Sequence, residues 1–130
     1  MKTIFLAGST GRGHVDWRKQ YYSLSDFNIF NPIVSVWTDL AKQREKEMRE
    51  SADILLFTIN GNNCYSIAEL VDCSNKRPDA TIGVFDYAEI ARNESINMAS
   101  ANAIRELAEQ NGAKIFVTHA QCIEYLKTIA

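Results

Sequence analysis

The most constraining feature of the sequence is a nearly uninterrupted apolar run at residues 52–59, Ala-Asp-Ile-Leu-Leu-Phe-Thr-Ile. A strand with one solvated face alternates apolar and polar side chains, whereas this run has almost no polar interruption. Such a strand is buried on both faces, which is typical of a central strand in a parallel sheet covered by helices on both sides. The run therefore predicts an α/β protein with this strand near the middle of its sheet.

Strand-like and helix-like segments alternate about five times along the 130 residues, which indicates a parallel sheet with crossover helices. The sequence predicts strands at residues 3–7, 27–32, 52–59, 80–85 and 113–118. It predicts helices at residues 16–24, 39–50, 66–72, 96–110 and 121–129, and a long irregular loop at residues 86–95. We expect residues 1–130 to form a single α/β domain, a flavodoxin-like or Rossmann-like three-layer sandwich with a five-stranded parallel sheet.

The charge balance and the cysteine content limit the classes of partner. Fourteen Lys and Arg residues against sixteen Asp and Glu residues give a net charge of −2, without the basic character that binding to a nucleic acid polymer requires. No apolar run approaches the roughly 18 to 20 residues that cross a bilayer. Three cysteines without C-x-x-C spacing predict neither a disulfide framework nor a zinc site, which is typical of a cytoplasmic protein. We expect no membrane contact, no metal and no cofactor, whereas a small anionic ligand held by local cations fits this composition.

Ligands of doubly wound sheets bind at the carboxyl ends of the strands, and this rule selects the polar segments at residues 8–18, 31–37 and 60–69. The first begins Gly-Ser-Thr-Gly-Arg-Gly and lacks both the Lys-Ser/Thr ending of a P-loop and the G-x-G-x-x-G spacing of a dinucleotide site. It therefore does not predict a nucleoside triphosphate or a dinucleotide. Its amides, with Arg12 or Arg18, could hold one phosphate or hydroxyl group. The alternative is a turn whose glycines serve packing alone.

Glu69 is the most informative single residue. It follows the apolar strand and lies near the start of the helix predicted at residues 66–72, where the positive end of the helix dipole favours an ionised carboxylate. Nucleophilic catalysis requires such a carboxylate. The alternative interpretation is structural, because Ser66 as N-cap and Glu69 three residues later fit a capping box. The pattern alone leaves both interpretations open.

Other polar and aromatic residues carry weaker signals. The helix predicted at residues 39–50 interleaves Glu45 with basic residues, which is typical of a solvated face with i,i+4 ion pairs. His14 and His119 are far apart and have no metal-ligand companion. Trp17 and Trp37 fit core positions, although a planar base also packs well against an aromatic wall.

Five segments, taken in order along the chain, carry a resemblance to a known family. They are Ile-Phe-Leu-Ala-Gly-Ser at residues 4–9, Asp-Trp-Arg at 16–18, Asn-Pro at 31–32, Arg-Glu-Ser-Ala-Asp at 49–53 and Tyr-Ser-Ile-Ala-Glu-Leu at 65–70. Together they resemble the nucleoside 2-deoxyribosyltransferases over roughly the first two thirds of the chain. The run Asp-Cys-Ser-Asn-Lys-Arg-Pro at 72–78 is similar to the family's small deoxyribosyltransferase-like branch, common in bacteria and phages.

The resemblance implies a flavodoxin-like enzyme that cleaves the N-glycosidic bond of a 2'-deoxynucleoside or its monophosphate. In the family a glutamate attacks the anomeric carbon and releases the base, and a second base or water then takes the sugar. By match to the family's segment this glutamate is Glu69. The family's acidic residue upstream of the Ala-Asp strand entrance, which helps to hold the sugar hydroxyl and the nucleophile, falls on Glu45. Family members usually form homo-oligomers and complete each other's pockets, so the resemblance implies a homo-oligomer here.

The chain departs from the family pattern at the site itself. Where well-studied members have an Asp about two turns before the nucleophile, this chain has Asn63, which cannot act as a general acid. Protonation of the departing base then needs Asp16, Glu45, water, or a base that leaves easily. Ser66 and Ala68 replace the family glycines that flank the glutamate, and we expect them to narrow the pocket.

The expected ligand is a small-molecule nucleoside or nucleotide. Two other functions stay open: a non-catalytic module that binds a nucleotide or sequesters a nucleotide signal, and a glycohydrolase of a ribonucleotide or a nicotinamide-type glycoside, whose cationic leaving group needs no acid. The predicted catalytic residues are Glu69, Glu45 and Asp16, and the predicted substrate-binding residues are Gly8, Ser9, Trp17, Arg18, Asn31, Asn63 and Ser66.

Overall fold

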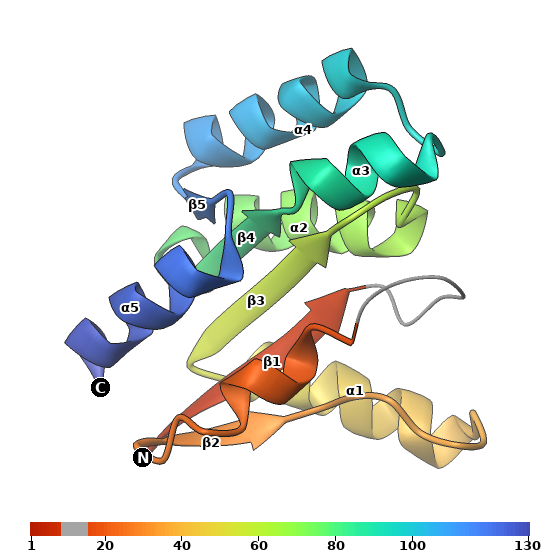
Figure 1. Cartoon of the computed structure of the whole chain (residues 1–130). Coiled ribbons are helices and arrows are strands. Elements are labelled where there is room, and N and C mark those ends of the chain that lie inside the picture. The colour runs from red at the N-terminus through yellow and green to blue at the C-terminus, as the bar shows by residue number, and fades with distance from the viewer. Residues whose placement is uncertain (9–15) are drawn as a thin grey trace.

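The computed structural model describes residues 1–8 and 16–130. Five strands form one sheet: β1 (Lys2–Gly8), β2 (Phe27–Phe30), β3 (Ile54–Ile59), β4 (Thr81–Phe85) and β5 (Lys114–Phe116). Their spatial order is β2-β1-β3-β4-β5, and all neighbouring pairs are parallel. This confirms the predicted five-stranded parallel sheet, with the apolar run supplying its central strand, β3 (Figure 1).

Helices cover both faces of the sheet, which confirms the predicted three layers. On one face lie α1 (Asp39–Ser51), α2 (Cys64–Lys76), α3 (Tyr87–Asn93) and α4 (Met98–Asn111), and on the other lie the 3-10 helix η1 (Arg18–Tyr21) and α5 (His119–Ile129) (Figure 1). Leu55 and Phe57 of β3 pack in the core of the first face, whereas Leu56 packs with α5 on the second. All six residues of β3 are buried because both faces are covered. None of the helices in these residues is long and apolar enough to cross a membrane.

The segment expected as a long loop at residues 86–95 contains the short helix α3, so that prediction is wrong. The Asp86 side chain caps the helix by accepting a hydrogen bond from the Glu89 amide at 3.1 Å. Ile90 anchors the helix in the core, where it is 1% exposed. A helix of seven residues makes only two turns, which is too short to show the repeating apolar period on which the sequence prediction depends.

The other elements are present with shifted ends. The helix predicted at residues 16–24 is reduced to η1, although Trp17, Tyr21 and Leu24 are buried on one side as its apolar pattern indicated. α5 begins at His119 because Thr118, expected as the last residue of a strand, is its N-cap and accepts from the Gln121 amide. A 3-10 helix, η2 (Pro78–Ala80), precedes β4.

α1 is the α-helix without a buried residue among those described. Hydrogen bonds hold its two ends. The Thr38 hydroxyl accepts from the Ala41 amide at 3.1 Å at the first end. At the second, the Arg77 guanidinium donates to the carbonyls of Arg49, at 3.1 Å, and Ala52, at 2.6 Å. Together with Met48, which packs against the core, these bonds hold α1 in place.

Candidate active site

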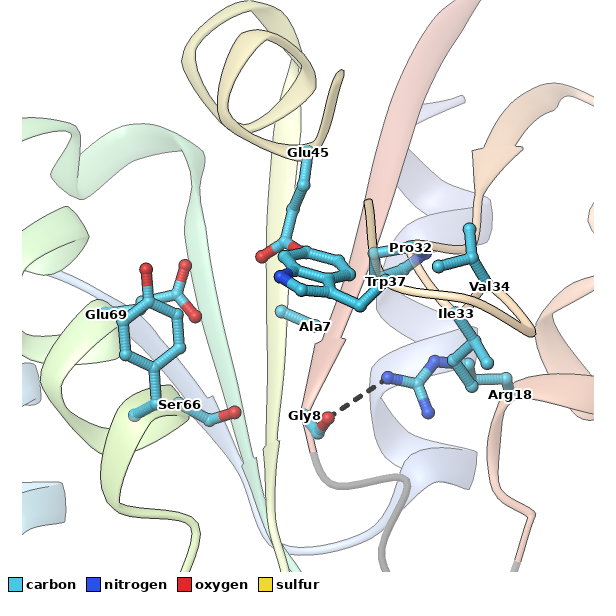
Figure 2. A pocket seen from close by; sticks show the side chains of 11 residues that line it. Ala7, Gly8, Arg18, Pro32, Ile33, Val34, Trp37, Glu45, Ser66 and Glu69 are labelled. Atoms are coloured by element: carbon cyan, nitrogen blue, oxygen red, sulfur yellow. Dashed lines mark hydrogen bonds between the residues drawn. The ribbon is translucent and has the colours of Figure 1, made fainter. Parts of the chain in front are cut away.

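A cavity of about 230 Å³ opens at the carboxyl end of β1, which lies between β2 and β3 in the sheet. This switch point is where doubly wound proteins bind their ligands. The end of β1, the segment after β2, η1, α1 and the start of α2 all contribute to its walls (Figure 2). The lining residues are Ala7, Gly8, Arg18, Pro32, Ile33, Val34, Trp37, Glu45, Tyr65, Ser66 and Glu69.

Gly8 lines this cavity where β1 ends, and its backbone has a φ of +139°. A Cβ at this position would lie 2.8 Å from the Thr58 carbonyl oxygen of β3 and 3.0 Å from the Trp17 ring. Both the conformation and the close approach of the two strands therefore require glycine here. Ser9, the next predicted binding residue, lies outside the described residues.

Glu69 extends from α2 toward the cavity (Figure 2). Because α2 begins at Cys64 with Asn63 as N-cap, Glu69 lies in the second turn, and the expected position in the first turn is wrong. The N-cap makes no side-chain capping hydrogen bond, so the capping-box interpretation also fails. The Glu69 carboxylate is instead paired with a cation, since Arg49 Nη1 donates a hydrogen bond to its Oε2.

Two pairs of side chains, each one helical turn apart, face each other across the gap between α1 and α2. Glu45 and Arg49 come from α1, and Tyr65 and Glu69 come from α2. Arg49 Nη1 lies 3.8 Å from Glu45 Oε1, and the Tyr65 side chain also interacts with the guanidinium. The side chains of Glu45, Arg49 and Glu69 are only 18%, 23% and 10% exposed. One partly buried cation therefore joins two carboxylates that line the same cavity.

Burial and the Arg49 charge act in opposite directions on the pKa of each carboxyl group. Burial raises the pKa of Glu69, the charge and hydrogen bond of Arg49 lower it, and the charge of Glu45 raises it again, with a net increase. Burial likewise raises the pKa of Glu45, against the charge of Arg49. The predicted stabilisation of the Glu69 carboxylate by the helix dipole is not found, because Glu69 lies in the second turn of α2 and its cationic partner is Arg49.

Arg18 brings a second guanidinium to the cavity wall. Its side chain is buried and donates from Nε to the Leu6 carbonyl at 3.2 Å. It also donates from Nη2 to the Gly8 carbonyl at 3.2 Å (Figure 2). Burial lowers the pKa of Arg18 to about 10, so the group is still charged at neutral pH. A fixed cation beside the end of β1 suits a negative or hydroxyl-bearing part of a ligand.

Three other predicted site residues do not line the cavity. Asp16 has a side chain that is 58% exposed and lies 3.8 Å from the Lys19 ammonium. Trp17 is 4% exposed and stacks on the His119 ring at 5.3 Å within the core. Asn31 uses its amide locally, accepting from the Ile33 amide and donating to the Tyr22 hydroxyl. Ser66, by contrast, lines the cavity from the first turn of α2.

Asn63 has a defined structural task. Its Oδ1 accepts hydrogen bonds from the amides of Asn60, at 3.0 Å, and Gly61, at 3.1 Å, and so holds the turn between β3 and α2. It does not line the cavity in the described part of the chain. This geometry gives Asn63 a role in shaping the loop rather than in contacting a ligand.

The sequence assigned no role to Arg49 or Tyr65, and it placed Trp37 in the core, with an aromatic wall as the alternative; the core position is wrong for Trp37. The signal for Arg49 and Tyr65 was their i,i+4 spacing from Glu45 and Glu69, which puts each pair on one helix face. Trp37 is 57% exposed and Tyr65 is 64% exposed, which is unusual for large aromatic side chains and indicates a surface available to a partner or ligand.

A larger hollow of about 810 Å³ adjoins the cavity along α1. Trp37, Glu45 and Tyr65 line both spaces, so they stand at the junction between the two. The outer hollow, which we call the α1 groove, is also lined by Asp39, Lys42, Gln43, Lys46 and Arg49. Within the described residues, no three His, Cys, Asp or Glu side chains are grouped to hold a metal ion.

The sheet order and the pair of carboxylates at the switch point define a doubly wound α/β protein whose site is suited to carboxylate chemistry. The family described as nucleoside 2-deoxyribosyltransferase like matches residues 1–88, a span that contains every residue lining the cavity. The chain belongs to this family, which confirms the resemblance found in the sequence. No curated protein matches the chain.

Proposed function

We propose that the protein cleaves or transfers the N-glycosidic bond of a 2'-deoxynucleoside or its monophosphate through a glycosyl ester of Glu69. The observation that carries the proposal is the pair Glu69 and Glu45, which face one cavity at the switch point in a chain of this family. Both carboxylates approach the same Arg49 nitrogen. A retaining mechanism needs two carboxyl groups near each other, about 5 Å apart, and a shared cation favours that arrangement.

In the proposed reaction, a Glu69 oxygen attacks C1' of the sugar as the bond to the base breaks. A 2'-deoxy sugar favours this step, because no 2'-hydroxyl withdraws electrons from the oxocarbenium-like transition state. We expect Arg18 and Gly8, which line the cavity, to hold the sugar or its 5' group.

A second candidate function is non-catalytic binding of a nucleotide. The ion pair between Glu69 and Arg49 and the replacement of an acid by Asn63 favour it, because a carboxylate held by a cation is a weaker nucleophile. If this function is correct, a bound nucleotide raises the melting temperature of the protein and no free base is released.

The test is a panel of deoxynucleosides, their 5'-monophosphates and the matching ribosides, incubated with the protein and analysed by chromatography for free base. We expect base release from at least one deoxy substrate, faster than from its riboside. Product formed in the presence of a second base or methanol should retain the configuration at C1'. Binding of these compounds without any base release would reject the enzymatic proposal in favour of the second candidate, and faster release from a riboside would reject the deoxy preference.

We also infer that the chain forms homo-oligomers through the surface around α1. α1 contributes no buried residue, and Val36 before the helix and Leu40 in its first turn are 68% and 76% exposed, which is typical of a contact surface. We expect light scattering to show an oligomer for the natural sequence and a smaller species for Leu40→Glu. A monomer at every concentration would reject the inference.

A further inference from the structure

We propose that the α1 groove is an anion-binding subsite, in which Lys42 and Lys46 bind a negatively charged group on the base of the substrate. The substrate class is then a 2'-deoxynucleoside whose base carries a carboxylate or another anionic substituent. This inference rests on the proposed function and deepens it, because it names the kind of base that departs. The whole chain has a net charge of −2, so such a ligand needs a local group of available cations.

Lys42 and Lys46 differ from every other basic side chain in residues 1–8 and 16–130. Each of the other Lys and Arg side chains in this part of the chain has an ion pair, a hydrogen bond or an aromatic ring as its partner. Lys42 and Lys46 have no such partner among the described residues. Both ammonium groups are therefore available to a ligand.

Acidic residues are close enough along α1 to pair with the two lysines. Asp39 and Glu45 are each three residues from Lys42, and Glu50 follows Lys46 by four residues. Helical ion pairs form at these spacings, but none of the three acids pairs with either lysine in the described structure. The helix also carries two like charges four residues apart, which is unfavourable in an isolated helix. A bound anion offsets this repulsion.

The two lysines share one groove. They lie one helical turn apart on α1, and both line the hollow of about 810 Å³. The charged residues that line it are Asp39, Lys42, Glu45, Lys46 and Arg49. The Arg49 guanidinium is bound to Glu69, which lies outside the groove in the inner cavity. The lysines are therefore the cations that the groove offers to a ligand.

A ligand that reaches Glu69 also reaches this groove. The inner cavity holds about 230 Å³, less than the roughly 300–1,000 Å³ of pockets that enclose a whole drug-sized ligand. A sugar at Glu69 therefore leaves its base at the junction with the α1 groove. Trp37 and Tyr65 line this junction and are 57% and 64% exposed, so their rings are available to stack on a base. Figure 2 shows the Trp37 indole beside the Glu45 side chain at this place.

The positions of the cations give the ligand a direction. Arg18 lines the inner cavity beside the end of β1 and does not line the α1 groove (Figure 2). Lys42 and Lys46 line the groove and not the inner cavity. If Arg18 holds the sugar or its 5' group, the base is the end of the ligand that faces the lysines. An anionic substituent on the base then forms charge-assisted hydrogen bonds with them.

The oligomer surface at Val36 and Leu40 lies apart from this subsite. Neither of these two residues lines the α1 groove. Leu40 is two residues from Lys42, and side chains at this spacing do not face the same side of a helix. Contacts at Leu40 therefore leave the groove lysines accessible.

The test measures KM and kcat for pairs of 2'-deoxyuridine derivatives that carry a carboxylate or a carboxamide at C5 or at C6 of the base. The two groups have nearly the same shape, and only the carboxylate is charged. For the natural protein we expect KM to be about fivefold lower for a carboxylate, the gain that two exposed ion pairs supply. Added salt should reduce this gain. The effect should lie in KM, because the substituent is charged both before and during the reaction.

In the double variant Lys42→Gln/Lys46→Gln we expect the two KM values to become equal. Comparing the ratio of KM values between proteins cancels any intrinsic difference between the two bases. The matched control is Lys127→Gln, because Lys127 is an exposed lysine on α5 that pairs with Glu124 and does not line the groove. This control should keep the preference for the carboxylate. Glutamine is a good helix former, and circular dichroism melting shows whether each variant is folded.

Three results would overturn the inference while base release leaves the proposed function in place. The first is equal KM values for each carboxylate and its carboxamide in the natural protein. The second is a preference for the carboxylate that persists in Lys42→Gln/Lys46→Gln. The third is a rise in KM in this variant for 2'-deoxyuridine 5'-monophosphate and not for the carboxylates, which would put the sugar end of the ligand in the groove.

Binding alone decides the subsite if no derivative releases its base, a result that would reject the enzymatic proposal. The melting temperature of the natural protein should then rise more with the carboxylates than with the carboxamides. This difference should be absent in Lys42→Gln/Lys46→Gln and present in Lys127→Gln. Equal rises with both kinds of derivative in the natural protein would overturn the subsite as well.

Discussion

Replacing Glu69 with glutamine is expected to lower base release by at least about 10³-fold, which corresponds to roughly 4 kcal/mol in activation free energy. Glutamine has nearly the same shape, but its amide oxygen is a far weaker nucleophile and cannot form the glycosyl ester. The loss should appear in kcat for all substrates, because the group acts in the chemical step itself. Chromatographic rates for the variant and the natural protein at saturating substrate measure it.

Two comparisons make the Glu69 result specific. Glu47→Gln removes a carboxylate from the same group of helices at an exposed position and should leave the rate within about twofold, an effect of less than 1 kcal/mol. Intact protein mass spectrometry of quenched reactions should show the added deoxyribosyl mass in the natural protein and not in Glu69→Gln. Equal rates for Glu69→Gln and the natural protein would remove Glu69 from the mechanism.

The sheet was predictable because its strands coincide with short apolar runs in the sequence, which are buried when the sheet is covered by helices. β3 shows this best, since all six residues are buried and the sequence has almost no polar break there. α3 was missed because seven residues with one deeply buried side chain, Ile90, carry too little periodicity. The start of α2 was placed too late because Ser66 and Glu69 imitate a cap, while the actual N-cap, Asn63, uses its side chain on the preceding turn.

The site was predictable only in part, for a different reason. Glu69 lies near the start of the helix that follows the central strand, so topology brings it toward the carboxyl edge of the sheet. Glu45 looked like a member of a solvated charged face, and only the family match selected it. Its environment depends on how α1 meets α2, a contact between residues about twenty positions apart that local pattern does not encode. The pairing of Arg49 with Glu69 depends on that same contact.

Replacing Arg49 with glutamine is expected to shift the pH dependence of catalysis and to destabilise the fold. Burial and the Glu45 charge raise the pKa of Glu69, and Arg49 opposes both. Without Arg49 the pKa of Glu69 rises further, so a smaller fraction of Glu69 is ionised at a given pH. The acidic limb of kcat/KM should therefore move to higher pH. Arg49→Lys keeps the charge and loses the planar fork, so we expect a smaller displacement.

Arg49→Gln should also lower the free energy of unfolding, and by more as the pH rises. A carboxyl group whose pKa in the folded state lies above its value in the unfolded chain binds its proton more tightly when folded. Arg49→Gln is therefore expected to be closest to the natural protein at low pH and to lose stability as the pH rises through the raised pKa of Glu69. We expect a cost of about 1–3 kcal/mol at neutral pH, below the range for a fully buried pair, because the Arg49 side chain is 23% exposed. Urea unfolding at about pH 5 and about pH 8 measures the difference.

A double-mutant cycle separates the ion pair from any other contribution of Arg49. In Glu69→Gln a neutral amide replaces the carboxylate. Adding Arg49→Gln to this variant should lower the free energy of unfolding by less than it does in the natural protein, with a coupling of about 1 kcal/mol or more. The residual cost then reports the contacts of Arg49 with Glu45 and Tyr65. Because α1 has no buried residue, a large coupling would mean that the polar contact across the cavity also helps to hold this helix against α2. Additive costs would instead mean that the guanidinium stabilises α1 without controlling the charge of Glu69, and the displacement of the acidic limb would then be absent as well.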